Sequence, residues 1–208
     1  MPRFAANLTM LFGEMPFLDR FAAAKAAGFA GVEYLFPYEF DKADLREQLN
    51  EHGLTQVLHN LPAGNWAKGE RGIAILPDRV DEFRDGVGRA IDYAKALDCG
   101  QLNCLVGIAP DDADPRELGE VLVTNLRFAA DALARERIKL LIEPINTLDI
   151  PGFYLKGTEQ AVQLIADVRS SNLFVQYDIY HMRSRCSRPA PPMAAKPGII
   201  RPWCGRWK

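Results

Sequence analysis

The 208-residue chain has no run of about eighteen apolar residues, the length that a helix needs to cross a bilayer. Its first residues also lack the long apolar stretch of a secretory signal. Its four cysteines show no Cys-x-x-Cys spacing, which disfavours a zinc or disulfide framework. We therefore expect a reduced, cytoplasmic protein with no membrane partner.

Several catalytic motifs are absent as well. The sequence has no phosphate-binding glycine fingerprint, no Gly-x-Ser-x-Gly elbow and no His-Glu-x-x-His helix. Residues 183–208 contain seven basic and no acidic side chains, which leaves 18 basic against 27 acidic residues in the remainder. An acidic body disfavours a nucleic-acid surface, so we expect no nucleic-acid partner.

What is present is an alternation of strand-like and helix-like segments over residues 1–182. Expected strands are 3–8, 31–36, 54–58, 101–106, a run ending at Glu143 and a run ending at Asp178. Expected helices are 16–27, 41–52, 78–97, 114–133 and 158–168, with Gly100 ending the third. A glycine-rich loop over 63–77 interrupts the pattern and is long enough to be functional. Such alternation predicts parallel strands covered by helices.

The predicted fold class is α/β, an incomplete (β/α)₈ TIM barrel with about six βα units. Residues 183–208 contain five prolines and no periodic apolar pattern, so they cannot supply two further units. We expect two regions: a partial barrel over 1–182 and an irregular, basic, proline-rich tail over 183–208.

Three side chains follow strand ends, where barrel enzymes place their active sites. Glu143 is held extended by Pro144, and Asp178 and His181 follow the sixth strand. Two carboxylates and an imidazole suit proton transfer or a divalent metal. The structural alternatives are an ion pair for Glu143, a turn cap for Asp178 and a backbone contact for His181.

Four further residues are candidates for substrate binding. His59 and Asn60 follow the third strand, and Asn103 lies near the end of the fourth. Arg71 in the long loop offers a guanidinium for a substrate carboxylate. A structural polar contact or a solvated loop charge is the alternative for each of them.

The chain resembles the hydroxypyruvate isomerase family, one of the xylose-isomerase-like barrels. The resemblance is carried by residues 3–12, 58–64, 69–73, 82–86, 141–146, 149–153 and 176–182. It implies interconversion of hydroxypyruvate and tartronate semialdehyde through an enediol, with Glu143 as acid/base. His181 matches the family's histidine beside the substrate, which is a small 2-oxo or hydroxy acid, and His59, Arg71 and Asn103 remain the other candidates to bind it.

The resemblance implies part of a metal site too. Related barrels hold a divalent ion such as Mg²⁺ or Mn²⁺ with Glu, Asp, His and Glu, and Glu143 and Asp178 match the first two. The family's second catalytic glutamate has no counterpart here, so we expect this chain to be poorly active or inactive. A homo-oligomer is compatible with the family.

The resemblance stops at Arg183, where the sequence looks like a C-terminal truncation or a shifted reading frame. Within enzymes, the alternatives are a 2-oxo-tetronate isomerase, a metal-dependent sugar 3-epimerase and a barrel endonuclease. Three histidines and an acidic body disfavour the endonuclease. The non-enzyme alternative is an inactive remnant with a basic binding tail.

Overall fold

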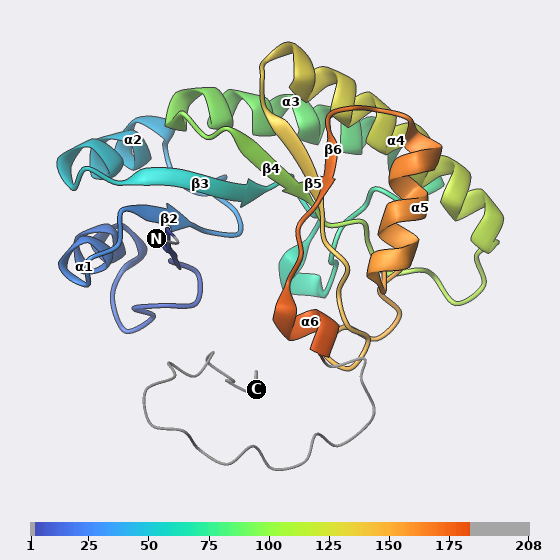
Figure 1. The fold of residues 1–208 in the computed structure, drawn as a ribbon, viewed down its shortest axis with the longest axis horizontal. Coiled ribbons are helices and arrows are strands. Elements are labelled where there is room, and N and C mark those ends of the chain that lie inside the picture. Colours follow the sequence, from blue (N-terminus) through green and yellow to red (C-terminus); the bar gives the residue numbers. More distant parts are fainter. Residues whose placement is uncertain (1–2, 184–208) are drawn as a thin grey trace.

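The computed structural model describes residues 3–183, which form a curved parallel sheet with helices along its outer side (Figure 1). The six strands lie side by side in chain order and every pair is parallel. They are β1 (Ala5–Asn7), β2 (Gly31–Glu33), β3 (Thr55–Asn60), β4 (Gln101–Cys104), β5 (Lys139–Ile142) and β6 (Leu173–Val175). The α-helices are α1 (Arg20–Ala26), α2 (Lys42–Glu51), α3 (Val80–Leu97), α4 (Pro115–Arg135), α5 (Thr158–Val168) and α6 (Ile179–Arg183). Three 3₁₀ turns are Phe17–Asp19, Trp66–Lys68 and Pro77–Arg79.

This arrangement confirms the predicted fold, an incomplete TIM barrel of six βα units. Among residues 3–183, β1 and β6 are the two edge strands of the sheet. The predicted boundary after residue 182 falls inside α6, and residues 184–208 of the predicted 183–208 tail lie outside the described residues. No helix in the described part of the chain combines the length and apolarity needed to cross a bilayer.

Several helix ends follow local sequence rules. Asp41 caps α2 by accepting a hydrogen bond from the Ala43 amide at 2.7 Å, and Asp114 caps α4 just before Pro115. Gly28 takes the left-handed conformation after α1, with φ +87°. The prediction that Gly100 ends α3 is wrong, because Asp98 adopts that conformation at φ +54°, which short polar side chains tolerate.

The buried apolar side chains form two clusters between the sheet and its helices. The smaller cluster joins β1 and β2 to α1 and α2, and the larger joins β4–β6 and the loop after β3 to α3, α4 and α5. The helices contribute to these clusters through their apolar faces. In α4 the buried residues on this face include Leu118, Leu122, Leu126, Ala129 and Leu133. Packing on the outer side leaves the strand ends free to carry polar groups.

The long loop after β3 is anchored to the loop after β4. Gly72 has φ +118°, and a Cβ there would overlap the carbonyl of Leu105. Gly107 lies against Gly72 and also has a positive φ of +124°. Two glycines thus let two backbones approach more closely than side chains permit.

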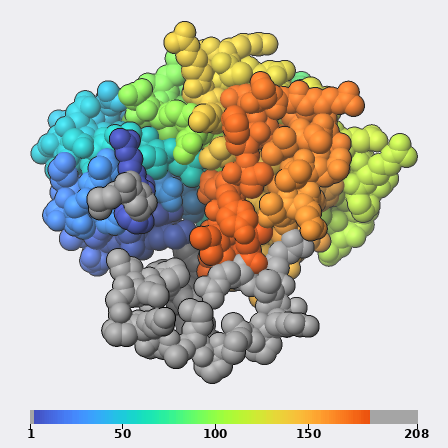
Figure 2. Space-filling view, in the orientation of Figure 1, coloured from blue at the N-terminus to red at the C-terminus, as the bar shows by residue number. Residues whose placement is uncertain are grey.

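In the space-filling view, the N-terminal quarter and the β6–α6 segment lie on one face (Figure 2).

Candidate active site

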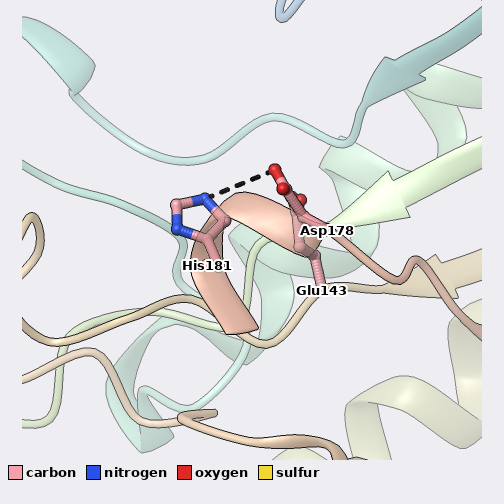
Figure 3. Close-up of side chains that lie close together, drawn as sticks. All are labelled: Glu143, Asp178 and His181. Atoms are coloured by element: carbon pink, nitrogen blue, oxygen red, sulfur yellow. Dashed lines mark ion pairs between the residues drawn. The ribbon is translucent and has the colours of Figure 1, made fainter. Parts of the chain in front are cut away.

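The carboxyl ends of β5 and β6 bring Glu143, Asp178 and His181 together (Figure 3). Glu143 directly follows β5, Asp178 directly precedes α6, and His181 lies within α6. One oxygen or nitrogen atom from each lies within 4.8 Å of those of the other two. The structure therefore juxtaposes the three residues that the sequence identified at strand ends.

Glu143 is buried, with 9% of its surface exposed. Its Oε2 accepts a 3.4 Å hydrogen bond from Nδ2 of Asn103. Burial raises the pKa of Glu143 to about 8, and the charges of Asp178 and Glu33 add to that rise. Hydrogen bonds from Gln176 and Asn103 act in the opposite direction. A carboxyl group whose pKa lies near neutral pH can both accept and return a proton.

Asp178 and His181 lie at the more open side of the cluster. Oδ1 of Asp178 accepts a hydrogen bond from the Tyr180 amide at 2.7 Å, so the expected turn cap is present alongside the site contact. Nε2 of His181 lies 3.8 Å from Oδ2 of Asp178. Nδ1 of His181 lies 2.8 Å from Nδ2 of Asn146, in the loop after β5. Burial lowers the pKa of His181, while Asp178 and Asp149 oppose that shift.

Two buried amides extend the site from β5 to β3. Nδ2 of Asn103 donates to Oδ1 of Asn60 at 3.1 Å as well as to Glu143. Both acceptors fix the orientation of the Asn103 amide, so its Oδ1 faces away from them. That oxygen and Nδ2 of Asn60 are buried without a hydrogen-bond partner. Unpaired buried polar atoms are costly, and a bound hydroxyl group, which both donates and accepts, could satisfy the Asn103 oxygen and the Asn60 NH₂ group.

Glu33 is a third acid at the site, which the sequence did not single out. It ends β2, where Asn7 of β1 is its register partner and donates to its Oε1 at 3.0 Å. Burial raises the pKa of Glu33, and so does the charge of Asp178. The expected strand ran to residue 36, which hid Glu33 in its middle. Its place in a Gly-Val-Glu-Tyr segment was the available signal.

His59 is not brought together with Glu143. Its ring stacks edge-on with Tyr38 at 6.0 Å, and its Nδ1 lies 3.2 Å from Nε2 of Gln56. Nε2 faces the backbone of Ala90 in α3 without hydrogen-bond geometry. Burial lowers the pKa of His59 to about 3, so the ring is neutral. It occupies the helix-facing side of β3, and substrate binding by His59 stays a prediction without a supporting contact.

Arg71 is held within its own loop. Its guanidinium lies 4.0 Å from the centre of the Trp66 ring and donates to the carbonyls of Trp66 and Glu70 at 3.2 and 2.7 Å. These contacts fix the position of the charge but show no link to Glu143. Binding of a substrate carboxylate by Arg71 also stays a prediction.

The predicted metal ligands fit a divalent ion only in part. Glu143 and Asp178 offer the hard oxygen donors that Mg²⁺ and Mn²⁺ prefer. His181 is the third group within 4.8 Å. Because Oδ1 of Asn146 accepts from two backbone amides, its NH₂ group faces Nδ1 of His181 at 2.8 Å, so Nδ1 must accept and the neutral ring carries its proton on Nε2. An imidazole nitrogen that carries a proton cannot ligate a metal. The three residues together are therefore not a metal site as arranged.

Comparisons with known proteins agree with this architecture. Residues 21–199 match the family described as a xylose isomerase-like TIM barrel. Hydroxypyruvate isomerase from Escherichia coli is 56% identical over 183 residues, which are 88% of this chain and 71% of that enzyme.

The chain belongs to the hydroxypyruvate isomerase family.

A 2-oxo-tetronate isomerase from Cupriavidus necator is 48% identical over 181 residues, 87% of this chain and 70% of that enzyme. The crystal structure of a Brucella melitensis protein described as an AP endonuclease of family 2 is 48% identical. It superposes with a TM-score of 0.86 over 88% of this chain and 70% of that one. The family is thus one of isomerase enzymes built on this barrel, and both relatives named for their substrates are isomerases.

Proposed function

We propose that this chain carries the active site of an isomerase that interconverts hydroxypyruvate and 2-hydroxy-3-oxopropanoate (tartronate semialdehyde). The observation that carries the proposal is the buried Glu143, whose pKa of about 8 lies close to neutral pH, beside Asp178 and His181. The 56% identity to the E. coli enzyme supports the choice of substrate.

The reaction moves one hydrogen between neighbouring carbons. The Glu143 carboxylate removes a proton from C3 of hydroxypyruvate, and the C–H electron pair forms the C2–C3 double bond of an enediolate. Protonated Glu143 then returns a proton to C2. The C3 hydroxyl loses its proton as the C3 aldehyde forms, and the former C2 carbonyl oxygen gains one. Atoms and charge balance, and no oxidant is needed.

Negative charge develops on the C2 oxygen during this step, so the site needs donors directed at it. Nδ2 of Asn60 is buried and unpaired and is available for this role. Asn103 holds Glu143 by its 3.4 Å hydrogen bond. We propose that Glu143 transfers the proton and that Asn60 and Asn103 bind substrate oxygens. No step here runs through a metal, and ligation by Glu143 and Asp178 stays a prediction.

A four-carbon 2-oxo sugar acid is the second candidate substrate. Its support is the 48% identity to the Cupriavidus enzyme, and the chemistry at C2 and C3 is the same. Phosphodiester cleavage, suggested by the description of the Brucella protein, fits less well. Glu33, Glu143 and Asp178 share one site, and their charges would repel a phosphate backbone.

The test is turnover of both acids by the chain and by Glu143→Gln, followed by exchange of the C3 hydrogen with deuterium in D₂O. We expect Glu143→Gln to lower kcat by about 10²–10⁴-fold, while the exposed Glu47→Gln on α2 has no effect. Equal exchange by Glu143→Gln and the parent chain would refute the role of Glu143. The ratio of kcat/KM values decides between the two substrates.

We further propose that turnover is low compared with the E. coli enzyme, since the family's second catalytic glutamate has no match here. A cytoplasmic location, a small-acid substrate as the main partner and a homo-oligomer stay predictions. A rate equal to that of the E. coli enzyme under the same conditions would overturn the proposal of low turnover.

A further inference from the structure

The loop after β5 fixes which way the Asn146 side-chain amide faces. Its Oδ1 accepts hydrogen bonds from the Leu148 and Asp149 amides at 3.0 and 2.9 Å. Its Nδ2 donates to Oδ2 of Asp149 at 2.8 Å. Rotating the amide by 180° would set a donor against two donors and an acceptor against a carboxylate. Asn146 therefore presents its NH₂ group, and only that group, to His181.

The orientation of Asn146 determines what His181 can carry. An NH₂ group has no lone pair to offer, so the His181 Nδ1 atom that lies 2.8 Å away must accept the hydrogen bond. A neutral imidazole that accepts at Nδ1 carries its proton on Nε2. That nitrogen is the one directed at the carboxylate of Asp178, 3.8 Å away, and toward Glu143 (Figure 3).

The surroundings favour the neutral ring. Only 17% of the His181 side chain is exposed, and removing a charge from water is unfavourable. A doubly protonated ring would also direct a second N–H at the NH₂ group of Asn146. Asp178 and Asp149 oppose this preference, but Asp149 already accepts the other hydrogen of the Asn146 amide.

We propose that Asn146 is a positioning residue that holds His181 in the tautomer protonated on Nε2, so that His181 acts as a hydrogen-bond donor to a substrate oxygen and not as a metal ligand. The donor role rests on the proposed isomerase function, whereas the tautomer does not. In this tautomer the neutral His181 ring donates a hydrogen bond to the developing enediolate. It can therefore bind an oxyanion beside two carboxylates without neutralising the charge of Glu143.

The tautomer is measured directly by ¹⁵N NMR of the full chain labelled at histidine, at a pH where the His181 ring is neutral. The chain has three histidines, and His181→Gln and His52→Gln assign the signals. We expect Nδ1 of His181 at the position of an unprotonated nitrogen and Nε2 at that of a protonated one. The reverse pattern would overturn the proposal without any reference to activity.

A matched pair of variants tests the cause. In Asn146→Asp combined with Asp149→Asn, the hydrogen bond between 146 and 149 is kept with its direction reversed, and the net charge is unchanged. Residue 146 then offers an acceptor, so the His181 proton should move to Nδ1. Asp149→Asn alone leaves the amide in place and should leave the tautomer unchanged. The proposed role of Asn146 is contradicted if the His181 proton stays on Nε2 in the double variant, or if it moves to Nδ1 in Asp149→Asn alone.

Titration with Mn²⁺ alone, followed by calorimetry, tests the second half of the proposal. His181→Gln should leave the affinity for Mn²⁺ within about twofold of the parent chain, because His181 is not a ligand. A loss of about tenfold or more is the size expected for a missing ligand or its support and would overturn the proposal. If the parent chain turned over neither acid while His181 showed the expected tautomer, the proposed function would fail and the tautomer assignment would stand.

Discussion

Glu143 should make the stability of the protein fall as the pH rises. The unfolded carboxyl ionises near 4.5, whereas the folded one has a pKa of about 8. Below about pH 4.5 both states hold the proton, so the group contributes no pH dependence there. Between these values the unfolded chain releases its proton while the folded chain retains it, so folding becomes less favourable as the pH rises. Above about pH 8 the effect levels off.

The size of the effect follows from the shift in pKa. One pKa unit corresponds to about 1.36 kcal/mol, so the full rise from 4.5 to about 8 sets a ceiling of about 5 kcal/mol. Glu143→Gln mimics the protonated acid: the amide oxygen still accepts from Asn103. Its NH₂ can donate to Oε1 of Gln176, which is buried and unpaired. The variant should therefore equal the parent near pH 4.5 and exceed it by up to about 5 kcal/mol near pH 8.

Urea denaturation at about pH 5, 7 and 9 measures this difference. Glu47→Gln is the matched control, since it removes an exposed carboxylate from α2 and should change stability by about 0.5 kcal/mol or less at every pH. The reasoning is refuted when Glu143→Gln is destabilising by the same amount at all three pH values. It is also refuted when the advantage of the variant shrinks as the pH rises.

Two further predictions concern packing. Gly72→Ala should destabilise the protein by about 1–3 kcal/mol, because φ is +118° and the new Cβ would overlap the Leu105 carbonyl. Its control is Gly88→Ala, which is exposed in α3 with open space around it and should stabilise the protein by about 0.5–1 kcal/mol. Leu122→Ala, fully buried in α4, should cost about 2–5 kcal/mol, whereas Val162→Ala, 59% exposed in α5, should cost less than about 1 kcal/mol. Both pairs are compared by urea denaturation, and equal effects within either pair contradict the packing described.

The fold was predictable because short-range signals agreed with one another. Asp114 and Pro115 place the start of α4 where the structure has it, and the predicted helix over 158–168 has the observed bounds of α5. Apolar periods of three and four residues identify the buried faces, since each stripe packs on the sheet. Strand ends were less predictable, because an apolar run continues into the loop beyond the last ladder bond, as at residues 105 and 106.

The site was predictable where one residue decides the geometry. Pro144 keeps Glu143 extended at the end of β5. Asp178 and His181 follow β6 and lie three residues apart, about one helical turn from each other. Glu33 and Asn146 were missed because their roles come from partners far along the chain: Asp178 for Glu33 and His181 for Asn146. Apart from the Gly-Val-Glu-Tyr segment around Glu33, no local pattern in the sequence points to these contacts.

The pairing of β2 with β3 contains one irregularity, which has a large effect on the site. Val32 pairs with Gln56 and Glu33 pairs with Leu58, so Val57 is skipped. Side chains alternate along a strand, and one extra residue reverses the side on which every later residue emerges. Beyond Val57, Asn60 meets Asn103 inside the sheet while His59 meets α3. If Val57 instead paired in the ladder without the bulge, the two would exchange sides: the His59 imidazole would face the site and the Asn60 amide would pack under α3.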